Sequence, residues 1–185
     1  MSSPLVIALP KAGNNVTEKA CKLLGLSPAH HKHTANYHLA ETNKVIYTYR
    51  NPRNALVSAV KYLNSQVRGM DSLITEDKLI DQFFDFFNCS LPYTYRAFAP
   101  WHKTSACIIK FEDLITKKEE MNKIADYMGV KHCSDATYAQ LYGSSPTWSG
   151  KLSEWELVWT DKLDHYWKEE GVVEIEQGLG YQLAL

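Results

Sequence analysis

The chain has 185 residues, and its 20 Lys+Arg nearly balance 21 Asp+Glu, for a net charge of -1. This length suits one compact domain spanning residues 1–185, and an apolar content of 45% excludes wholesale disorder. Nucleic-acid-binding proteins usually carry a clear positive excess, so we expect no nucleic-acid partner. No apolar run in the sequence is long enough for a signal peptide or a membrane span. The four cysteines form no CxxC pair, so we expect free thiols, a cytoplasmic location and no metal.

The first third of the chain alternates apolar strands with helix signals. Leu5–Leu9 is short, apolar and followed by Pro10, which is typical of a buried strand. Asn15 is the expected cap of a helix that ends near Leu24. One short strand is expected within residues 30–39, and Val45–Tyr49 is a β-branched and aromatic strand. A further helix then begins at an Asn-Pro pair.

The remaining two thirds are predicted to be mainly helical, with one more strand. Ala106–Lys110 has the apolar character of a buried strand. Apolar spacings of three and four residues, together with cap and stop signals, predict helices around it. These helices are expected at Glu76–Leu91, Tyr93–His102, Glu119–Met128, Ser134–Tyr142 and from about residue 154 to Glu170.

Strands that alternate with helices predict an α/β fold of three layers, α/β/α, with a parallel sheet. Ligands of such folds bind at the carboxyl ends of the strands. The turns at residues 10–15 and 50–53 both follow a strand and open a helix. They are therefore the first places to look for a binding site.

The first turn reads Pro10-Lys-Ala-Gly-Asn-Asn15. Its Lys11 supplies a point charge for a phosphate-like group, Gly13 allows close backbone approach, and the helix N-terminus offers N–H groups. The Walker A pattern GxxxxGK[ST] is absent from the sequence. Taken alone, this turn is equally compatible with an ordinary strand-to-helix connection that carries a surface lysine.

The second turn reads Arg50-Asn-Pro-Arg-Asn-Ala-Leu-Val-Ser58. Arg50 ends a strand and suits bidentate binding of phosphate, and the Ser58 hydroxyl can add one hydrogen bond from the next helix. Taken alone, each residue is better explained without a ligand, Arg50 as a surface residue and Ser58 as a residue that packs against the sheet.

Together the two turns resemble those of sulfotransferases that use 3′-phosphoadenosine 5′-phosphosulfate (PAPS). In that family the first loop, P-K-S/A-G-T-T, grips the 5′-phosphosulfate, and R-[DN]-P-R-D-x-x-x-S grips the 3′-phosphate. Ile108-Ile-Lys-Phe-Glu-Asp-Leu114, Gly150-Lys-Leu-Ser-Glu-Trp155 and Gly178-Leu-Gly-Tyr181 resemble the later Y-E-D-L, G-x-x-G-D-W and L-G-Y segments. The five motifs agree with the family in order and approximate spacing, and they cover nearly the whole chain.

The resemblance implies a P-loop nucleoside triphosphate hydrolase-like fold and an enzyme that moves a sulfuryl group from PAPS to a hydroxyl or amine acceptor, releasing adenosine 3′,5′-bisphosphate (PAP). The acceptor would be a small molecule, a glycan or a peptide, and no membrane partner is expected. The implied cofactor-binding residues are Lys11, Ala12, Gly13, Asn14, Asn15, Arg50, Ser58, Gly150 and Lys151, with Lys11 also stabilising the leaving phosphate.

The sequence departs from the family pattern in the first loop and around the late glycine. Asn14 and Asn15 replace the paired threonines of the first loop, and Val16 replaces the aromatic residue after them. Trp148-Ser149 replaces the Arg-Lys before the late glycine, and Ser153-Glu154 stands where Gly-Asp is usual. These changes leave open a member that binds PAP without transferring sulfate. A phosphotransferase that uses ATP is the other alternative, against which the missing Walker A pattern argues.

A histidine-rich stretch supplies the candidate base that removes the acceptor proton. The family commonly places a catalytic His in a K-T-H or K-x-H context after a strand, and Lys32-His33 is the best match. A His with an ordinary pKa suits general base catalysis near neutral pH. His30, His31 and His38 compete with His33, and the stretch is alternatively a solvated loop or a metal site.

Overall fold

The computed structural model describes residues 3–66, 73–141, 152 and 154–181. Contacts divide the chain into two compact units, one of residues 1–50 and 98–150 and the other of residues 51–97 and 151–185. The first unit holds the strands, which are β1 (Leu5–Ala8), β2 (Ala29–Lys32), β3 (Val45–Tyr49) and β4 (Cys107–Lys110). The second unit, within its described residues, is helical.

The four strands form one parallel sheet in the order β2-β1-β3-β4. The β1–β3 register pairs Leu5 with Val45, and it continues without a shift to the end of β1. The β1–β2 register shifts between Leu5 and Ile7. Because all strands run in the same direction, their carboxyl ends meet at one edge of the sheet.

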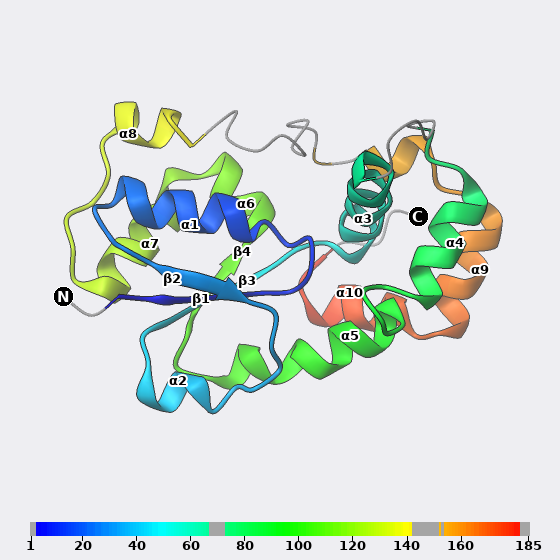
Figure 1. The fold of residues 1–185 in the computed structure, drawn as a ribbon, viewed down its shortest axis with the longest axis horizontal. Coiled ribbons are helices and arrows are strands. Elements are labelled where there is room, and N and C mark those ends of the chain that lie inside the picture. Colours follow the sequence, from blue (N-terminus) through cyan, green and yellow to red (C-terminus); the bar gives the residue numbers. More distant parts are fainter. Residues whose placement is uncertain (1–2, 67–72, 142–151, 153, 182–185) are drawn as a thin grey trace. The chain divides into compact units, whose positions relative to one another are not determined.

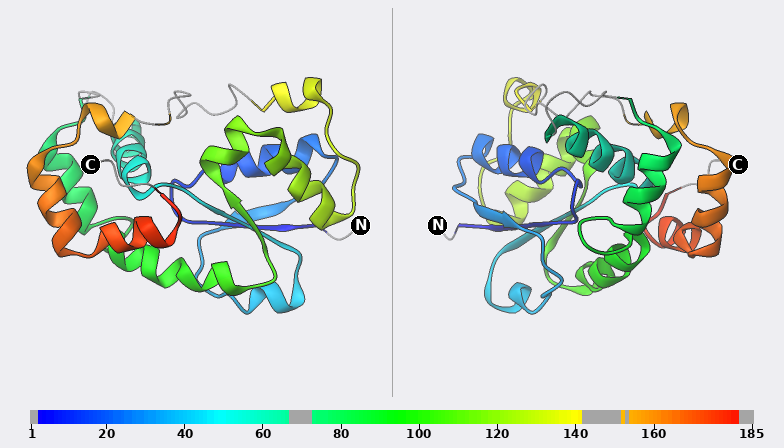
Figure 2. Two further views of the ribbon diagram at one scale, coloured as in Figure 1. Left: turned by 180° about the vertical axis from the view of Figure 1, so that it is seen from behind. Right: turned by 45° about the vertical axis from the view of Figure 1, so that its right-hand side comes forward.

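Helices cover both faces of this sheet (Figure 1). On one face lie α1, α6 and α7, and on the other lies α2; the view from behind in Figure 2 shows the same layering. The bounds are α1 Asn14–Leu23, α2 Leu39–Thr42, η1 Ala99–Lys103, α6 Phe111–Thr116, α7 Lys118–Met128 and α8 Asp135–Ala139. This arrangement confirms the predicted three-layer α/β fold with a parallel sheet.

Apolar burial explains why these segments become strands. Val6, Ile7, Ile46 and Ile109 are completely buried, as expected of strands covered on both faces. The buried Thr48 forms a hydroxyl pair with Thr17 of α1, with 2.9 Å between their Oγ1 atoms, which satisfies both polar groups.

The helical unit contains α3 (Pro52–Gln66), α4 (Glu76–Phe84), α5 (Leu91–Phe98), η2 (Glu154–Leu157), α9 (Asp161–Glu169) and α10 (Val172–Gly178). The Asn51 side chain caps α3 as predicted, because its Oδ1 accepts hydrogen bonds from the backbone N–H of Arg53 at 2.9 Å and of Asn54 at 3.3 Å. Helix α3 packs against α4 and η2, and α9 packs against α4 and α10.

Three sequence predictions of helices are wrong in detail. The helix predicted at Glu76–Leu91 ends at Phe84, because Asp85 leaves the helical conformation with a φ of -126° and a ψ of 55°. Phe87 and Asn88 then adopt positive φ angles of 56° and 73°. Asn15 is not the cap of α1, which begins one residue earlier and follows Gly13. The helix expected up to Glu170 is divided into η2 and α9, and α10 follows them.

Candidate functional site

The segments that follow the four strands lie next to one another at the carboxyl edge of the sheet. In sheet order they begin with His33 after β2, Pro10–Asn15 after β1, Arg50 after β3 and Phe111 after β4. The sheet therefore brings together three predicted parts of the site from distant parts of the sequence. They are the base His33, the loop of residues 10–15 that is predicted to bind the 5′-phosphosulfate (the 5′ loop), and Arg50, which is predicted to bind the 3′-phosphate. All of these residues belong to the first unit.

The loop between β1 and α1 has an unusual backbone. Lys11 has a φ of 60° and Gly13 a φ of 88°, and the backbone N–H of Ala12 donates to the Leu9 carbonyl at 3.1 Å. A left-handed conformation at a non-glycine residue is costly, and such strain is concentrated at functional sites. Helix α1 begins at Asn14, directly after Gly13. The backbone N–H groups of Asn14 and Asn15 therefore lie in the first turn of the helix and point toward the loop.

The side chain of Arg50, from the end of β3, reaches the loop that carries Lys11. Arg50 is only 9% exposed, and its Nη1 donates to the Lys11 carbonyl oxygen at 3.2 Å. Burial and the neighbouring Arg50 charge lower the pKa of Lys11 to about 8. Two positive charges held together at a helix N-terminus favour the binding of an anion, whose charge offsets their repulsion.

Phe111 contacts both the 5′ loop, at Gly13, and the side chain of Arg50. Its buried ring is packed so closely against Gly13 that a methyl group there would overlap the ring carbons Cδ2 and Cε2. The Cζ atom of Arg50 lies 4.5 Å from the centre of the same ring. The sequence indicates that Gly13 allows close approach of a ligand, whereas in the structure the close neighbour of Gly13 is Phe111.

His33 is fixed to the end of β1 by one hydrogen bond. Its Nδ1 lies 2.7 Å from the carbonyl oxygen of Ala8. A carbonyl oxygen only accepts hydrogen bonds, so Nδ1 carries a proton and donates. In the neutral ring, Nε2 is then the atom that can accept a proton.

Two other histidines, His38 and His102, have different surroundings. The exposed His38 forms an ion pair with Glu41, with 2.8 Å between Nδ1 and Oε1. His102 packs edge-on against Tyr49, with 4.7 Å between ring centres, and burial lowers the pKa of His102. Sequence reasoning did not single out His102, because it lies in the η1 turn without a recognisable motif.

Ser58 belongs to the helical unit and lies on a defined face of α3. Asn54, Ser58 and Lys61 follow one another at spacings of four and three residues, which places them on one face of the helix. The Asn54 Nδ2 donates to the Leu152 carbonyl at 2.5 Å, and Lys61 Nζ lies 2.5 Å from Glu154 Oε2. Leu152 and Glu154 therefore both contact the α3 face that carries Ser58. Gly150 and Lys151, two predicted cofactor-binding residues, lie outside the described residues.

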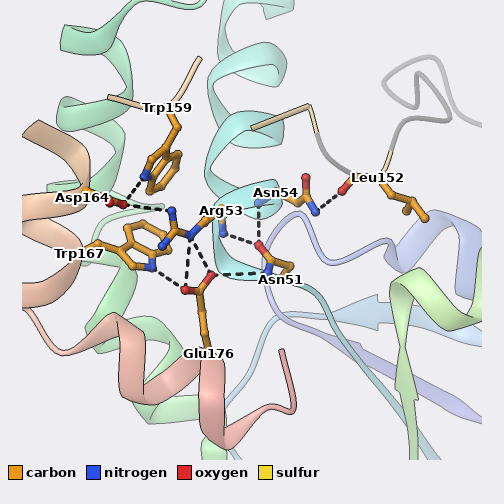
Figure 3. A network of polar contacts seen from close by, with 8 residues as sticks. All are labelled: Asn51, Arg53, Asn54, Leu152, Trp159, Asp164, Trp167 and Glu176. Atoms are coloured by element: carbon orange, nitrogen blue, oxygen red, sulfur yellow. Dashed lines mark hydrogen bonds and ion pairs between the residues drawn. The ribbon is translucent and has the colours of Figure 1, made fainter. Parts of the chain in front are cut away.

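The start of α3 is tied to the C-terminal helices by a buried arginine (Figure 3). Arg53 is 7% exposed, and its Nε lies 3.2 Å from Oε1 of Glu176, which is 3% exposed. Its Nη1 lies 3.1 Å from Oδ1 of Asp164. The Arg53 guanidinium also lies against the rings of Trp155, Trp159 and Trp167.

The carboxylate of Glu176 is shared among several donors (Figure 3). Trp167 Nε1 donates to its Oε2 at 2.9 Å, and Asn51 Nδ2 lies 3.5 Å from its Oε1. A buried carboxylate is stable only when it is paired and hydrogen-bonded in this way. The second arginine of the R-N-P-R motif therefore has a structural role that its sequence position did not reveal.

Metal-ligand clusters and membrane-spanning helices are both absent from the described part of the chain. Across residues 3–66, 73–141, 152 and 154–181, no group of three or more His, Cys, Asp or Glu side chains is arranged to hold a metal ion. Among those same residues, no helix combines the length and apolar character needed to cross a bilayer.

Comparisons with known proteins identify the family of the chain. The sequence model of the family described as "Sulfotransferase domain" matches residues 14–142. The fold is similar to that of mouse sulfotransferase SULT7A1, crystallised in complex with PAP, with a TM-score of 0.71 at 15% identity, over 91% of this chain and 82% of that chain. A comparison with curated proteins found no match. Because the family match spans most of the chain, the protein belongs to the sulfotransferase family, whose members take a sulfuryl group from PAPS, as the sequence motifs predict.

Proposed function

We propose that the two units form one sulfotransferase-like domain, in which Lys11, His33, Arg50 and Ser58 carry out sulfuryl transfer. The observation that supports this most strongly is the pair of cations Lys11 and Arg50, held together at the N-terminus of α1. This pair suits a ligand with several phosphate-like groups, and PAPS has such groups at both its 5′ and 3′ positions.

In this proposal the cofactor-binding roles are divided between the two turns. Lys11 and the backbone N–H groups of residues 13–15 bind the 5′-phosphosulfate, with Ala12, Gly13, Asn14 and Asn15 forming the loop. Arg50 and Ser58 bind the 3′-phosphate, and Gly150 and Lys151 close over the nucleotide. The position of Leu152 and Glu154 along the Ser58 face of α3 supports this last assignment.

PAPS supplies an activated sulfuryl group, which the acceptor oxygen or nitrogen attacks in line with the leaving phosphate. His33 Nε2 takes the acceptor proton as the new bond to sulfur forms. The bond between sulfur and the 5′-phosphate oxygen breaks, and Lys11 stabilises the negative charge that develops on that oxygen. Positioning and charge stabilisation supply most of the catalysis, as in phosphoryl transfer.

The acceptor is proposed to be a hydroxyl or amine of a small molecule, glycan or peptide. A cytoplasmic location is supported by Cys21, Cys89, Cys107 and Cys133, which are all free thiols. The balanced net charge of -1 supports a function without nucleic acid.

A transfer assay tests the proposal. The protein is incubated with PAPS labelled at sulfur and with panels of phenols, alcohols, amines and simple glycans, and both labelled product and PAP are measured. We expect product and PAP in equal amounts with at least one acceptor class. Binding of PAP without any transfer would favour the inactive member, and transfer of phosphate from ATP would favour the phosphotransferase.

A further inference from the structure

Phe111 occupies a position at which it contacts both parts of the proposed cofactor site. It is the first residue of α6, directly after β4, and it is 2% exposed. Its ring has two neighbours from other strand ends: Gly13 from the loop after β1 and Arg50 from the end of β3. Neither neighbour is close to Phe111 in the sequence.

The contact with Gly13 sets the position of the 5′ loop. A β-carbon at Gly13 would overlap the Phe111 ring, so the loop backbone rests directly on the ring. Gly13 also has a φ of 88°, which side chains rarely adopt, and it is the residue from which α1 begins. The ring therefore sets the position of the first backbone N–H groups of α1 relative to the sheet.

The contact with Arg50 sets the position of the guanidinium. The Cζ atom of Arg50 lies 4.5 Å from the centre of the ring, and the Lys11 carbonyl accepts a hydrogen bond from Nη1 at 3.2 Å. Stacking on an aromatic ring uses the face of a guanidinium and leaves its planar edge available for bidentate contact with a phosphate. Arg50 is thus held by the ring on one side and by the 5′ loop on another.

From these two contacts we infer that Phe111 is a positioning residue that holds the 5′ loop and Arg50 in a fixed spacing. In the proposed site the 5′ loop binds the 5′-phosphate and Arg50 binds the 3′-phosphate of PAP, so a fixed spacing favours binding of both phosphates at once. The inference rests on the proposed function, since it assigns Arg50 to the 3′-phosphate. It implies that the aromatic face of residue 111, beyond its apolar volume, is needed for tight binding of PAP.

A double-mutant cycle with Arg50 tests this role. Phe111→Leu keeps an apolar side chain and removes the aromatic face, whereas Phe111→Tyr keeps the ring. We expect Phe111→Leu to weaken PAP binding about three- to thirtyfold, the range of a partly to fully desolvated cation–π contact. In an Arg50→Met background the same change should have an effect of less than about twofold, because the coupled partner is gone.

Controls separate positioning from general stability. The Phe111→Tyr variant should bind PAP with an affinity within about twofold of that of the parent protein, since the ring is retained. Leu114→Met changes another buried residue of α6 and should leave PAP affinity unchanged. Melting temperatures measured in parallel show that each variant is folded.

The possible outcomes distinguish the inference from the proposed function. Equal losses of PAP affinity on Phe111→Leu in the parent protein and in the Arg50→Met variant would overturn the inference and leave the proposed function standing. Failure of Phe111→Tyr to restore binding would do the same. Absence of PAP binding by the parent protein would overturn both.

Discussion

The Nδ1 atom of His33 lies 2.7 Å from the carbonyl oxygen of Ala8, the last residue of β1. This hydrogen bond joins the proposed base to the strand that leads into the Lys11 loop. It also requires a proton on Nδ1, which leaves Nε2 as the proton acceptor in the neutral ring. The orientation of the base and its tautomer are therefore set by the same backbone group.

Replacement of His33 should separate catalysis from cofactor binding. His33→Asn keeps an N–H donor near the position of Nδ1 but removes the base, and His33→Ala removes both. Both variants should lower turnover about 10²–10⁴-fold, the usual contribution of a general base. PAP affinity, measured by calorimetry, should be unchanged in both.

His38→Ala is the matched control, because the exposed His38 pairs with Glu41. It should retain the parent turnover. If His38→Ala abolished turnover while His33→Asn did not, the base would be His38 and the assignment of His33 would be wrong.

Activity should fall at alkaline pH because Lys11 loses its charge. The pKa of Lys11 is lowered to about 8 by burial and by Arg50, so the side chain is protonated below this pH and neutral above it. Binding of the anionic cofactor requires the charged form, and kcat/KM reports the free enzyme. With an alcohol acceptor that does not titrate, kcat/KM should therefore decline above about pH 8.

Lys11→Arg tests whether Lys11 causes the alkaline decline of kcat/KM, because arginine stays charged over the whole pH range. Its profile should lack the alkaline decline, whatever its absolute activity. An identical decline in the parent and in Lys11→Arg would show that another group titrates.

Arg50 should determine the preference for a 3′-phosphate. Arg50→Met keeps the apolar stem against Phe111 and removes the charge, and it should weaken PAP binding by about 1.5–3 kcal/mol, the value of a hydrogen bond to a charged group. ADP lacks the 3′-phosphate, so its affinity should change much less. Equal losses for PAP and ADP in parallel titrations would argue against this assignment.

Glu176 should be important for the stability of the helical unit. Glu176→Ala leaves the buried Arg53 without its buried partner and removes the acceptor of Trp167. Loss of one partner of a buried pair costs about 3–5 kcal/mol, and we expect the free energy of unfolding to fall by this amount in urea titrations.

Asp164→Asn is the comparison for Glu176, because it contacts the same Arg53 from a side chain that is 41% exposed. Its effect should be much smaller, since water screens and replaces an exposed partner. Similar losses of stability for the two variants would contradict the central role of Glu176.

The sequence predicted the parallel sheet well, because its strands depend on local signals. Short apolar runs marked β1, β3 and β4, and parallel strands necessarily bring Lys11 and Arg50 to one edge. The family match and the fold similarity confirm the predicted family, the α/β class and the PAPS-dependent enzyme class. The residues of the site itself stay predictions.

The features that the sequence did not predict depend on contacts between distant residues. Arg53 and Glu176 are 123 positions apart, and nothing near either residue indicates the other. The apolar spacing of three and four residues continues past Phe84 and is compatible with a longer helix. The helix nevertheless ends at Phe84, and Phe87 adopts a positive φ angle. The support that Phe111 gives to Gly13 likewise arises only when β4 packs into the sheet.

The most direct test of the account is an equilibrium titration of the protein with PAP, beside ADP and ATP with Mg²⁺. A site that binds the 3′-phosphate through Arg50 should bind PAP at least about tenfold more tightly than ADP, a difference in binding free energy of roughly 1.4 kcal/mol. Thermal stabilisation should follow the same order, reaching about 2.7 kcal/mol at 100 times the Kd. Preferential binding of ATP with Mg²⁺, or no response to PAP, would contradict the account.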